Sequence, residues 1–353
     1  MPLSPEELNR YSRHLLMDEF GIEAQLKLKS SKVLVVGAGG LGCPCLLYLA
    51  AAGVGFLGIA DDDVVSLSNL QRQILYNTED VGLPKAEISK QLLLKKNPFV
   101  QIETHGRIDP QNVLSIIENY DLVIDGSDNF STRYLLNDAC VITRKPYIYG
   151  ALFKFEGQVS VFNYQDGPTY RCLYPEAPAA GEVPACGEAG VLGVLPGIIG
   201  TWQATEAIKI ITGLGEPLKG KLLVINLLSN SFEVLNFSAN PANKEIIQLG
   251  VYDEVCAADL NSIDYKTLTS WLSDENIDLI DVREEHEYER YSIGGRNIPL
   301  PELEDFLSTF DHKKKTVLFC QTGTRSLQAM EFLKTQLPQL EVYNLKGGLQ
   351  ATL

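Results

Sequence analysis

The sequence lacks an excess of basic residues, and this excludes a large class of partners. Its 353 residues include 30 Lys and Arg against 45 Asp and Glu, which gives a formal net charge of -15. Most of the surface must repel a phosphate backbone, so we expect no nucleic-acid partner. The chain also lacks tandem repeats and is longer than a usual single domain, which predicts two domains, each with its own core.

The N-terminal residues lack the features of a secretory signal. MPLSPEELNRYSRHLL has acidic residues and prolines where a signal peptide has a basic segment followed by an apolar one. Residues 33–60 carry no charge and are long enough to resemble a membrane span, but seven glycines and Pro44 divide them into strand, helix and strand. We therefore expect no membrane segment and a cytoplasmic location.

The seven cysteines lack regular spacing, and no CxxC pair occurs. An odd, irregular set does not form a disulfide framework and favours a reducing compartment. Cys43 and Cys45 lie two positions apart on an expected helix and point to different faces, so they indicate neither a zinc clip nor a redox pair. We interpret these two, Cys140 and Cys256 as packing residues.

Strands and helices alternate along the first part of the chain, which is typical of a doubly wound, Rossmann-like α/β fold. The pattern predicts strands at 33–36, 56–60, 100–103 and 122–124, and helices at 5–18, 41–52, 85–96 and 110–119. From Tyr147 it changes to shorter strands at 158–162, 222–226 and 232–235, which indicates a mixed sheet. A long loop at 168–190 and an apolar helix at 195–211 lie among them.

A polar stretch then separates a second strand and helix series. Its expected strands lie at 277–282, 316–319 and 342–345, and its helices at 265–272, 303–310 and 324–337. We predict a first domain at 1–243, a linker at 244–258 and a small α/β domain at 259–353.

A glycine-rich turn follows the first strand. Gly37, Gly39 and Gly42 fit GxGxxG, with Gly40 inside the motif, and Asp61 ends the next strand, where it can accept from a ribose hydroxyl. The pattern predicts a nucleotide site, and the alternative is a tight turn without a ligand. On these residues alone an NAD-linked oxidoreductase is a second candidate, which tight ATP binding without NAD binding would dismiss.

Polar and charged residues follow this turn. Asn69, Arg72, Lys85 and Asp128 suit a nucleoside triphosphate with Mg²⁺, because charge on a departing pyrophosphate must be offset. Asp128 follows a buried strand and is the candidate Mg²⁺ ligand. Three of them also have a simpler interpretation: Arg72 as a surface ion pair, Lys85 as a solvated helix start, and Asp128 as a helix N-cap, a role for which Ser127, Asn129 and Ser131 compete.

A second candidate site lies in the small domain. The loop CQTGTR consists of Cys320, Gln321, Thr322, Gly323, Thr324 and Arg325, between an expected strand and an expected helix. Loop amides and a helix N-terminus favour a thiolate or a persulfide anion on the cysteine. A buried structural cysteine is the alternative. Phosphatase Cys-to-Arg loops have one residue more, so the shorter loop favours sulfur over phosphate.

Seven segments together resemble the MoeB/ThiF family, ubiquitin-activating-like enzymes that adenylate the C-terminus of a small sulfur-carrier protein: RYSRHLL, VGAGGLG, VSLSNLQRQ, VGLPKAE, DGSDNFSTRYLLND, FEGQVSVF and CGEAGVLGVLPGIIG. The resemblance implies ATP and Mg²⁺, with Asp61 on the ribose, Asn69, Arg72 and Lys85 on the phosphates, and Asp128 on the metal. It also implies that Arg13 reaches the neighbouring subunit's site, and therefore a homodimer.

The segments LIDVREEHEYERYSIGGRNIPL, CQTGTRS and LKGGL resemble a rhodanese, in which Asp281 and Arg283 would support the base of the loop. The two resemblances together imply adenylation of a MoaD/ThiS-like β-grasp carrier ending in Gly-Gly. A persulfide on Cys320 would then form a thiocarboxylate, with a cysteine desulfurase or thiosulfate as sulfur donor. The pathway stays open among molybdopterin, thiamine and related routes. The alternatives are adenylation with a non-catalytic rhodanese-like module, or a scaffold that binds a carrier without activating it.

The resemblance also bears on Cys186 and Cys172. Cys186 stands where some relatives keep a cysteine that bonds the carrier, and the alternative is a surface cysteine without a task. Many relatives hold a structural zinc with two CxxC pairs, but here Thr169 replaces the first cysteine, Cys172 remains, and PANKE replaces the second pair. We therefore predict no structural zinc.

Overall fold

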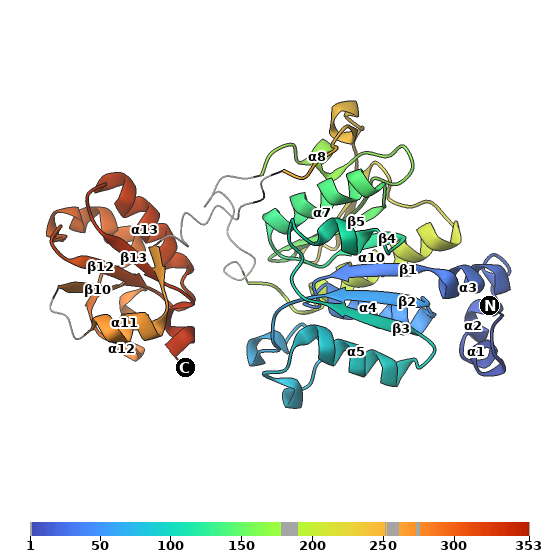
Figure 1. The fold of residues 1–353 in the computed structure, drawn as a ribbon, viewed down its shortest axis with the longest axis horizontal. Helices are drawn as coiled ribbons and strands as arrows, with labels where there is room; N and C mark the ends of the chain where they lie inside the picture. Colours follow the sequence, from blue (N-terminus) through green and yellow to red (C-terminus); the bar gives the residue numbers. More distant parts are fainter. Residues whose placement is uncertain (1, 178–189, 251, 253–260, 273–275, 353) are drawn as a thin grey trace. The chain divides into compact units, whose positions relative to one another are not determined.

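The structure is a computed structural model that describes residues 2–177, 190–250, 252, 261–272 and 276–352 (Figure 1). The chain divides into a larger unit that ends at Tyr252 and a smaller unit that follows it. The division falls within the expected linker, and the bounds 1–243 and 259–353 stay predictions. None of the helices in the described ranges combines the length and apolar character that a membrane crossing needs.

An eight-stranded mixed sheet forms the centre of the larger unit, in the order β3-β2-β1-β4-β5-β6-β7-β8. The pairs from β3 to β5 are parallel, and the pairs from β5 to β8 are antiparallel. The predicted mixed sheet is confirmed. The strands are β1 Lys32–Val36, β2 Phe56–Ala60, β3 Gln101–His105, β4 Leu122–Asp125, β5 Tyr147–Phe153, β6 Glu156–Phe162, β7 Lys221–Asn226 and β8 Ser231–Asn236.

Helices cover both faces of this sheet (Figure 1). They are α1 Pro5–Arg10, α2 Ser12–Leu15, α3 Gly21–Ser30, α4 Gly42–Ala52, α5 Lys85–Lys96, α6 Val113–Ile117, α7 Phe130–Thr143, α8 Tyr170–Leu173 and α10 Val194–Thr212. Among the described residues, three 3₁₀ turns accompany them: η1 Leu67–Asn69, η2 Thr78–Asp80 and η3 Pro241–Lys244.

The single helix that we expected at 5–18 is wrong. It breaks at Tyr11, whose ring is buried and whose hydroxyl accepts a hydrogen bond of 2.9 Å from Asn97 Nδ2. Tyr11 has a φ of -92° and a ψ of 11°, which are not helical, so α1 and α2 are separate helices.

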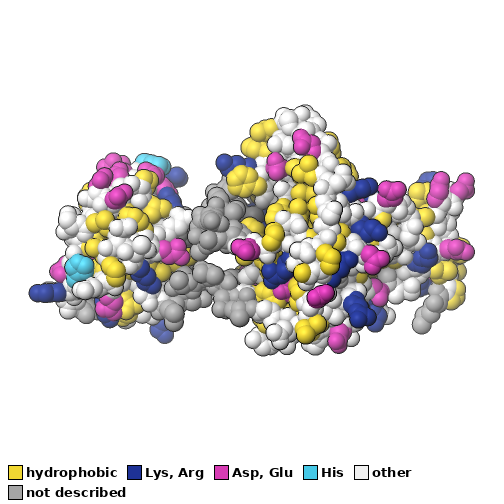
Figure 2. All heavy atoms as spheres, turned by 90° about the horizontal axis from the view of Figure 1, so that it is seen from above, with side chains coloured by type: hydrophobic (Ala, Val, Ile, Leu, Met, Phe, Trp, Pro, Cys, Tyr) yellow, Lys and Arg dark blue, Asp and Glu magenta, His cyan; other side chains and the backbone are white. Residues whose placement is uncertain are grey.

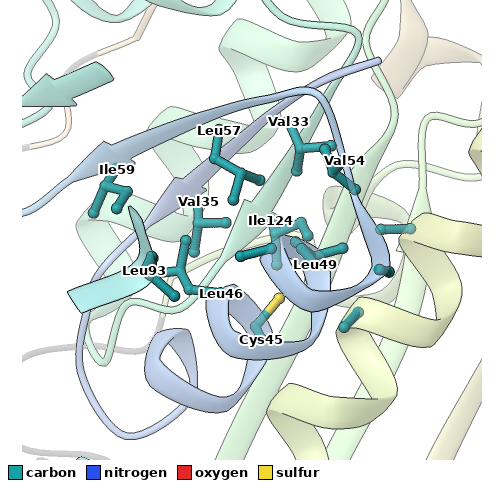
Figure 3. Packing of buried hydrophobic residues seen from close by; sticks show 14 of the residues in the cluster. Val33, Val35, Cys45, Leu46, Leu49, Val54, Leu57, Ile59, Leu93 and Ile124 are labelled. Carbon is teal, nitrogen blue, oxygen red and sulfur yellow. The ribbon is translucent and has the colours of Figure 1, made fainter. Parts of the chain in front are cut away.

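The core explains why β1 is apolar from Val33 to Val36. Val33 and Val35 pack on the side of α4, α5 and α10, whereas Leu34 and Val36 pack on the side of α6 and α7. Alternate residues of a strand face opposite sides, so a strand buried on both faces needs no polar positions. Figure 3 shows Val33 and Val35 beside Cys45, Leu46 and Leu49 of α4.

The smaller unit is built on a five-stranded parallel sheet in the order β11-β10-β12-β13-β9. Its strands are β9 Ser262–Ile263, β10 Ile277–Asp281, β11 Arg296–Asn297, β12 Lys315–Phe319 and β13 Val342–Leu345. Its helices are α11 Tyr265–Trp271, α12 Glu285–Arg290 and α13 Thr324–Gln336, with 3₁₀ segments η5 Leu300–Thr309 and η6 Gly348–Thr352.

The helix expected at 303–310 is therefore a 3₁₀ segment that begins earlier. The Glu302 N–H donates to the Pro299 carbonyl over three residues, at 2.9 Å, while Pro301 has no N–H to donate. Acidic and basic side chains are interspersed on the visible surfaces of both units (Figure 2).

Candidate active sites

The glycine turn lies at the point where the strand order reverses, between β1 and β4. The Gly37 N–H donates to the Ala60 carbonyl at 2.8 Å, and the Gly126 N–H donates to the Val36 carbonyl at 2.7 Å. Gly37 has a φ of +93°, and a Cβ there would lie 2.6 Å from the Gly126 carbonyl oxygen. Open parallel sheets bind ligands at this kind of position, so the turn lies where a nucleotide would be held.

The turn presents a run of available backbone donors. In the described part of the chain, the N–H groups of Gly39, Gly40, Leu41 and Gly42 donate to no protein acceptor. Helix α4 begins at Gly42, and no side chain caps its N-terminus. Unpaired amides and the positive end of a helix dipole together form an anion site, and phosphate fits it.

Asp61 is anchored beside this turn. Its Oδ2 accepts from the Ala38 N–H at 2.7 Å and its Oδ1 from the Asp63 N–H at 2.9 Å. Burial raises the pKa of its carboxyl group. Each oxygen keeps a second lone pair, so the carboxylate can still accept from a hydroxyl.

Lys85 begins α5 but is not a solvated helix start, because only 5% of it is exposed. Its Nζ lies 2.8 Å from Oδ2 of Asp63, whose side chain is largely exposed. Asp63 was not among the predicted site residues. The run of three aspartates at 61–63 was the only signal for it.

Arg72 lies against the turn. Its Cδ is 3.5 Å from the place that a Cβ on Gly40 would occupy, and its Nη1 donates to the Ser68 carbonyl at 3.1 Å. Within the described ranges it forms no ion pair. Asn69 ends η1, where its Oδ1 accepts from the Ser66 N–H at 3.2 Å and its amide N–H₂ stays available.

Gln73 lies beside the turn and was not among the predicted site residues. Its side chain is buried, and its Nε2 lies 3.6 Å from the place of a Cβ on Gly39. Among the described residues its Oε1 has no hydrogen-bond partner. Its position next to Arg72 was the only available signal.

The structure distinguishes Asn129 from Asp128 in the loop after β4, where the sequence left the helix N-cap open. Asn129 is the N-cap of α7, since its Oδ1 accepts from the Thr132 N–H at 2.8 Å. Asp128 is exposed, and its side chain has no hydrogen bond or ion pair within the described chain.

A lone free carboxylate fits Mg²⁺, which proteins usually bind through one or two carboxylates together with substrate phosphates. No cluster of three or more His, Cys, Asp or Glu suited to a metal occurs in the described ranges, so the substrate would have to supply further ligands. Arg13 lies exposed on α2, and its side chain forms no hydrogen bond or ion pair with the residues that the structure describes.

The second site lies at the end of β12. Cys320 is fully buried, and its Sγ accepts from the Gly323 N–H at 3.2 Å. The Ser326 hydroxyl lies 3.5 Å from this Sγ and 2.7 Å from Asn344 Oδ1, and its single hydrogen can serve only one of them. Helix α13 starts directly after Gly323, which has a φ of +93°, and no side chain caps it.

The LKGGL segment supports this loop. The Leu349 N–H donates to the Cys320 carbonyl at 2.9 Å, and the Gln350 N–H donates to the Gln321 carbonyl at 3.1 Å. A Cβ on Gly348 would overlap the Cys320 carbonyl oxygen, so the two segments are in backbone contact.

Both arginines of the sulfur site are paired with carboxylates. Arg283 binds Asp281 at 2.7 Å and also donates to Gln321 Oε1 at 3.2 Å, so it lies at the base of the loop. Arg325 forms two hydrogen bonds with Glu287, at 2.7 and 2.8 Å. These bonds lower the pKa of Glu287 to about 2. No spacing rule identifies Glu287, because it lies 38 residues from Arg325.

Hydrogen bonds surround Cys172, the cysteine that the sequence retains of the expected CxxC pairs. Its Sγ lies 3.4 Å from Thr169 N, 3.2 Å from Asn240 N and 3.6 Å from Asn243 Nδ2. Burial would raise the pKa of this thiol, but these bonds outweigh burial and lower it. Two pairs among these residues have the two-residue separation of a CxxC pair: Thr169 with Cys172, and Asn240 with Asn243. Polar contacts thus join the two segments.

The remaining cysteines fall into two groups. Cys43, Cys45 and Cys140 are fully buried, and burial raises the pKa of each thiol, which fits packing residues. Cys186 and Cys256 lie outside the described residues.

Comparisons with known proteins cover almost the whole chain. The model of the ThiF family matches residues 11–246, and that of the rhodanese-like domain matches residues 264–352. A "Probable adenylyltransferase/sulfurtransferase MoeZ" of Mycobacterium tuberculosis is 42% identical over 99% of this chain and 93% of that protein. An "Adenylyltransferase and sulfurtransferase MOCS3" of Drosophila persimilis is 40% identical over 99% of this chain and 84% of that protein.

The fold has solved relatives as well. The crystal structure of E. coli MccB with MccA-N7isoASN aligns with a TM-score of 0.61 and 24% identity, over 69% of this chain and 75% of that one. The resemblances drawn from the motifs are confirmed, and the NAD-linked oxidoreductase is set aside. The chain belongs to the ThiF family and carries a C-terminal rhodanese-like domain, as an adenylyltransferase and sulfurtransferase.

Proposed function

We propose that the larger unit uses ATP to adenylate the C-terminal Gly-Gly carboxylate of a small β-grasp sulfur carrier of the MoaD/ThiS type. The smaller unit then delivers sulfur from a persulfide on Cys320. The observation that carries the first step is the run of unpaired N–H groups from Gly39 to Gly42 at the start of α4. A further observation supports the carrier: a relative from Porphyra purpurea, 41% identical over 99% of this chain, is named a probable molybdopterin-synthase adenylyltransferase.

In this proposal the turn amides hold the phosphates of ATP, and Asp61 accepts from the ribose. Arg72, Lys85 and Asn69 bind the phosphates, and the two cations offset the charge that builds on the departing pyrophosphate. Lys85 is buried, and its partner Asp63 is exposed to solvent. The ion pair therefore holds the ammonium group in place, while solvent around Asp63 weakens the attraction and leaves the positive charge available to phosphate. The carrier carboxylate attacks the α-phosphorus, pyrophosphate leaves, and an acyl-adenylate forms.

Mg²⁺ would be held by Asp128 with the phosphates, and it would supply further charge stabilisation there. We assign Arg13 to the neighbouring subunit's site, which requires a homodimer. The exposure of Arg13 and its lack of a partner among the described residues support this assignment.

The sulfur step balances as a substitution at the acyl carbon. The terminal sulfur of the Cys320 persulfide attacks the acyl-adenylate, the C–O bond to AMP breaks, and an acyl disulfide to Cys320 remains. A second thiol, for which Cys186 is our candidate, attacks Cys320 Sγ and releases the carrier as a thiocarboxylate. Cys186 and Cys320 are then joined by a disulfide, which a cellular thiol reduces. This chemistry needs free thiols, so we infer a cytoplasmic location.

Two variants test the division of labour. Asp128→Ala should abolish carrier-dependent exchange of pyrophosphate into ATP, whereas Cys320→Ala should leave exchange intact and stop formation of the thiocarboxylate. Glu118→Ala removes an exposed carboxylate of the same unit and serves as the control. Exchange is measured with labelled pyrophosphate, and the thiocarboxylate by intact mass of the carrier. Equal loss of exchange in both variants would refute the proposal.

A further inference from the structure

The cation of the sulfur loop is held by a carboxylate. Arg325 is the last residue of the loop, and both of its Nη atoms donate to Glu287, at 2.7 and 2.8 Å. The bidentate geometry fixes the guanidinium plane toward α12. The second arginine near the loop, Arg283, is likewise paired with Asp281.

The surroundings of this pair are anionic. Residues 284–290 contain four glutamates and one arginine, and Glu284, Glu285 and Glu289 are exposed beside Glu287. The other loop side chains, Gln321 and Thr322, carry no charge. The loop therefore has no uncompensated cation among its described residues, although its backbone amides and the start of α13 favour one negative charge on sulfur.

Sulfur donors differ in the charge of the group that leaves. With thiosulfate, the Cys320 thiolate attacks the outer sulfur, the S–S bond breaks, and sulfite leaves with two negative charges. With a persulfide on a cysteine, the thiolate attacks the terminal sulfur, and a thiolate with one negative charge leaves. An oxyanion donor thus needs a free cation near the loop, and a persulfide donor does not.

We propose that Glu287 is a specificity-determining residue that keeps Arg325 from binding oxyanions, so that Cys320 takes its sulfur from a cysteine persulfide rather than from thiosulfate. This rests on the proposed function, in which Cys320 carries the sulfur. Glu287 acts through Arg325 and is a positioning residue.

The test compares two donors on the full-length chain. Glu287→Gln removes the charge and retains the size of the side chain and its acceptor for the Glu284 N–H. We expect kcat/KM for thiosulfate, relative to that for cysteine persulfide, to rise roughly tenfold, mostly through a lower KM, because one charge-assisted contact to the sulfonate becomes available.

Two further variants distinguish the release of Arg325 from a general loss of negative charge on α12. Glu285→Gln removes one charge from the same helix without releasing Arg325, so its donor ratio should stay near that of the unaltered chain. In the double variant Glu287→Gln/Arg325→Gln the gain should disappear. A donor ratio in Glu287→Gln that is unchanged or lower, with a normal thermal unfolding profile, overturns the inference. Persistent transfer in Cys320→Ala would refute the proposed function instead, and the two failures are thus distinguishable.

Discussion

The four glycines of the nucleotide turn should separate into residues required for the fold and residues required for the ligand. A Cβ on Gly42 would overlap the Gly37 carbonyl oxygen, a backbone atom that cannot move aside alone. A Cβ on Gly39 would meet nothing nearer than Gln73 Nε2, at 3.6 Å, and Gly39 does not have a left-handed φ. We therefore predict opposite effects of alanine at these two positions.

The magnitudes follow from these contacts. Gly42→Ala overpacks the turn, which should cost about 3 kcal/mol and lower the Tm of the larger unit by roughly 6–12 °C. Gly39→Ala should change stability by less than about 1 kcal/mol, with a stabilising sign, because it restricts the unfolded chain. Gly39 carries one of the amides that we assign to the phosphates, however, and a methyl group next to that amide should hinder the approach of a phosphate. Loss of one amide–phosphate hydrogen bond should weaken ATP binding roughly 10- to 100-fold.

Thermal unfolding measures the first effect, and calorimetric titration with ATP and Mg²⁺ measures the second. Gly39→Ala keeps the fold and loses the ligand, so it isolates binding from stability. An unchanged ATP affinity in Gly39→Ala would refute the assignment of the turn amides to the phosphates. A fully stable Gly42→Ala would refute the close contact between the turn and the start of α4.

Two more predictions concern protonation and metal content. Glu287 has a folded-state pKa of about 2 against an ordinary 4.5, so its stabilisation is complete above pH 4.5 and is lost as the pH falls toward 2. Because the pair with Arg325 is partly exposed, we expect about 1 kcal/mol from it, measured as the difference in acid unfolding between the unaltered chain and Glu287→Gln. Protein purified in metal-free buffer should contain less than stoichiometric zinc by elemental analysis. One zinc per chain would contradict our interpretation of Cys172.

Local patterns in the sequence predicted the elements that hold both sites. The strand before Gly37, the helix after it and the strand before Cys320 all appear where periodicity and glycine placed them. This succeeds because a buried parallel strand is apolar throughout, and because a strand-to-helix turn requires glycine at fixed positions.

Long-range contacts were beyond the sequence. The break at Tyr11 depends on a hydrogen bond from Asn97, 86 residues away, and the pair of Arg325 with Glu287 spans 38 residues. Asp128 and Asn129 are equally good caps by residue type, and only the geometry of α7 assigns the cap to Asn129. The first two contacts are formed by tertiary packing, which leaves no local pattern, and the cap is decided between adjacent residues that residue type alone does not distinguish.

Both sites combine a glycine of positive φ with a helix start that no side chain caps, but the charges around them differ. Gly37 and Gly323 both have a φ of +93°, and each precedes a helix start that no side chain caps. Around the first turn, Arg72 forms no ion pair within the described residues, whereas in the second loop Arg325 is bound by Glu287. ATP carries several negative charges and a persulfide carries one. The pairing of its arginine therefore suits the second loop to the smaller charge, and this difference would let one chain keep triphosphate and sulfur chemistry apart.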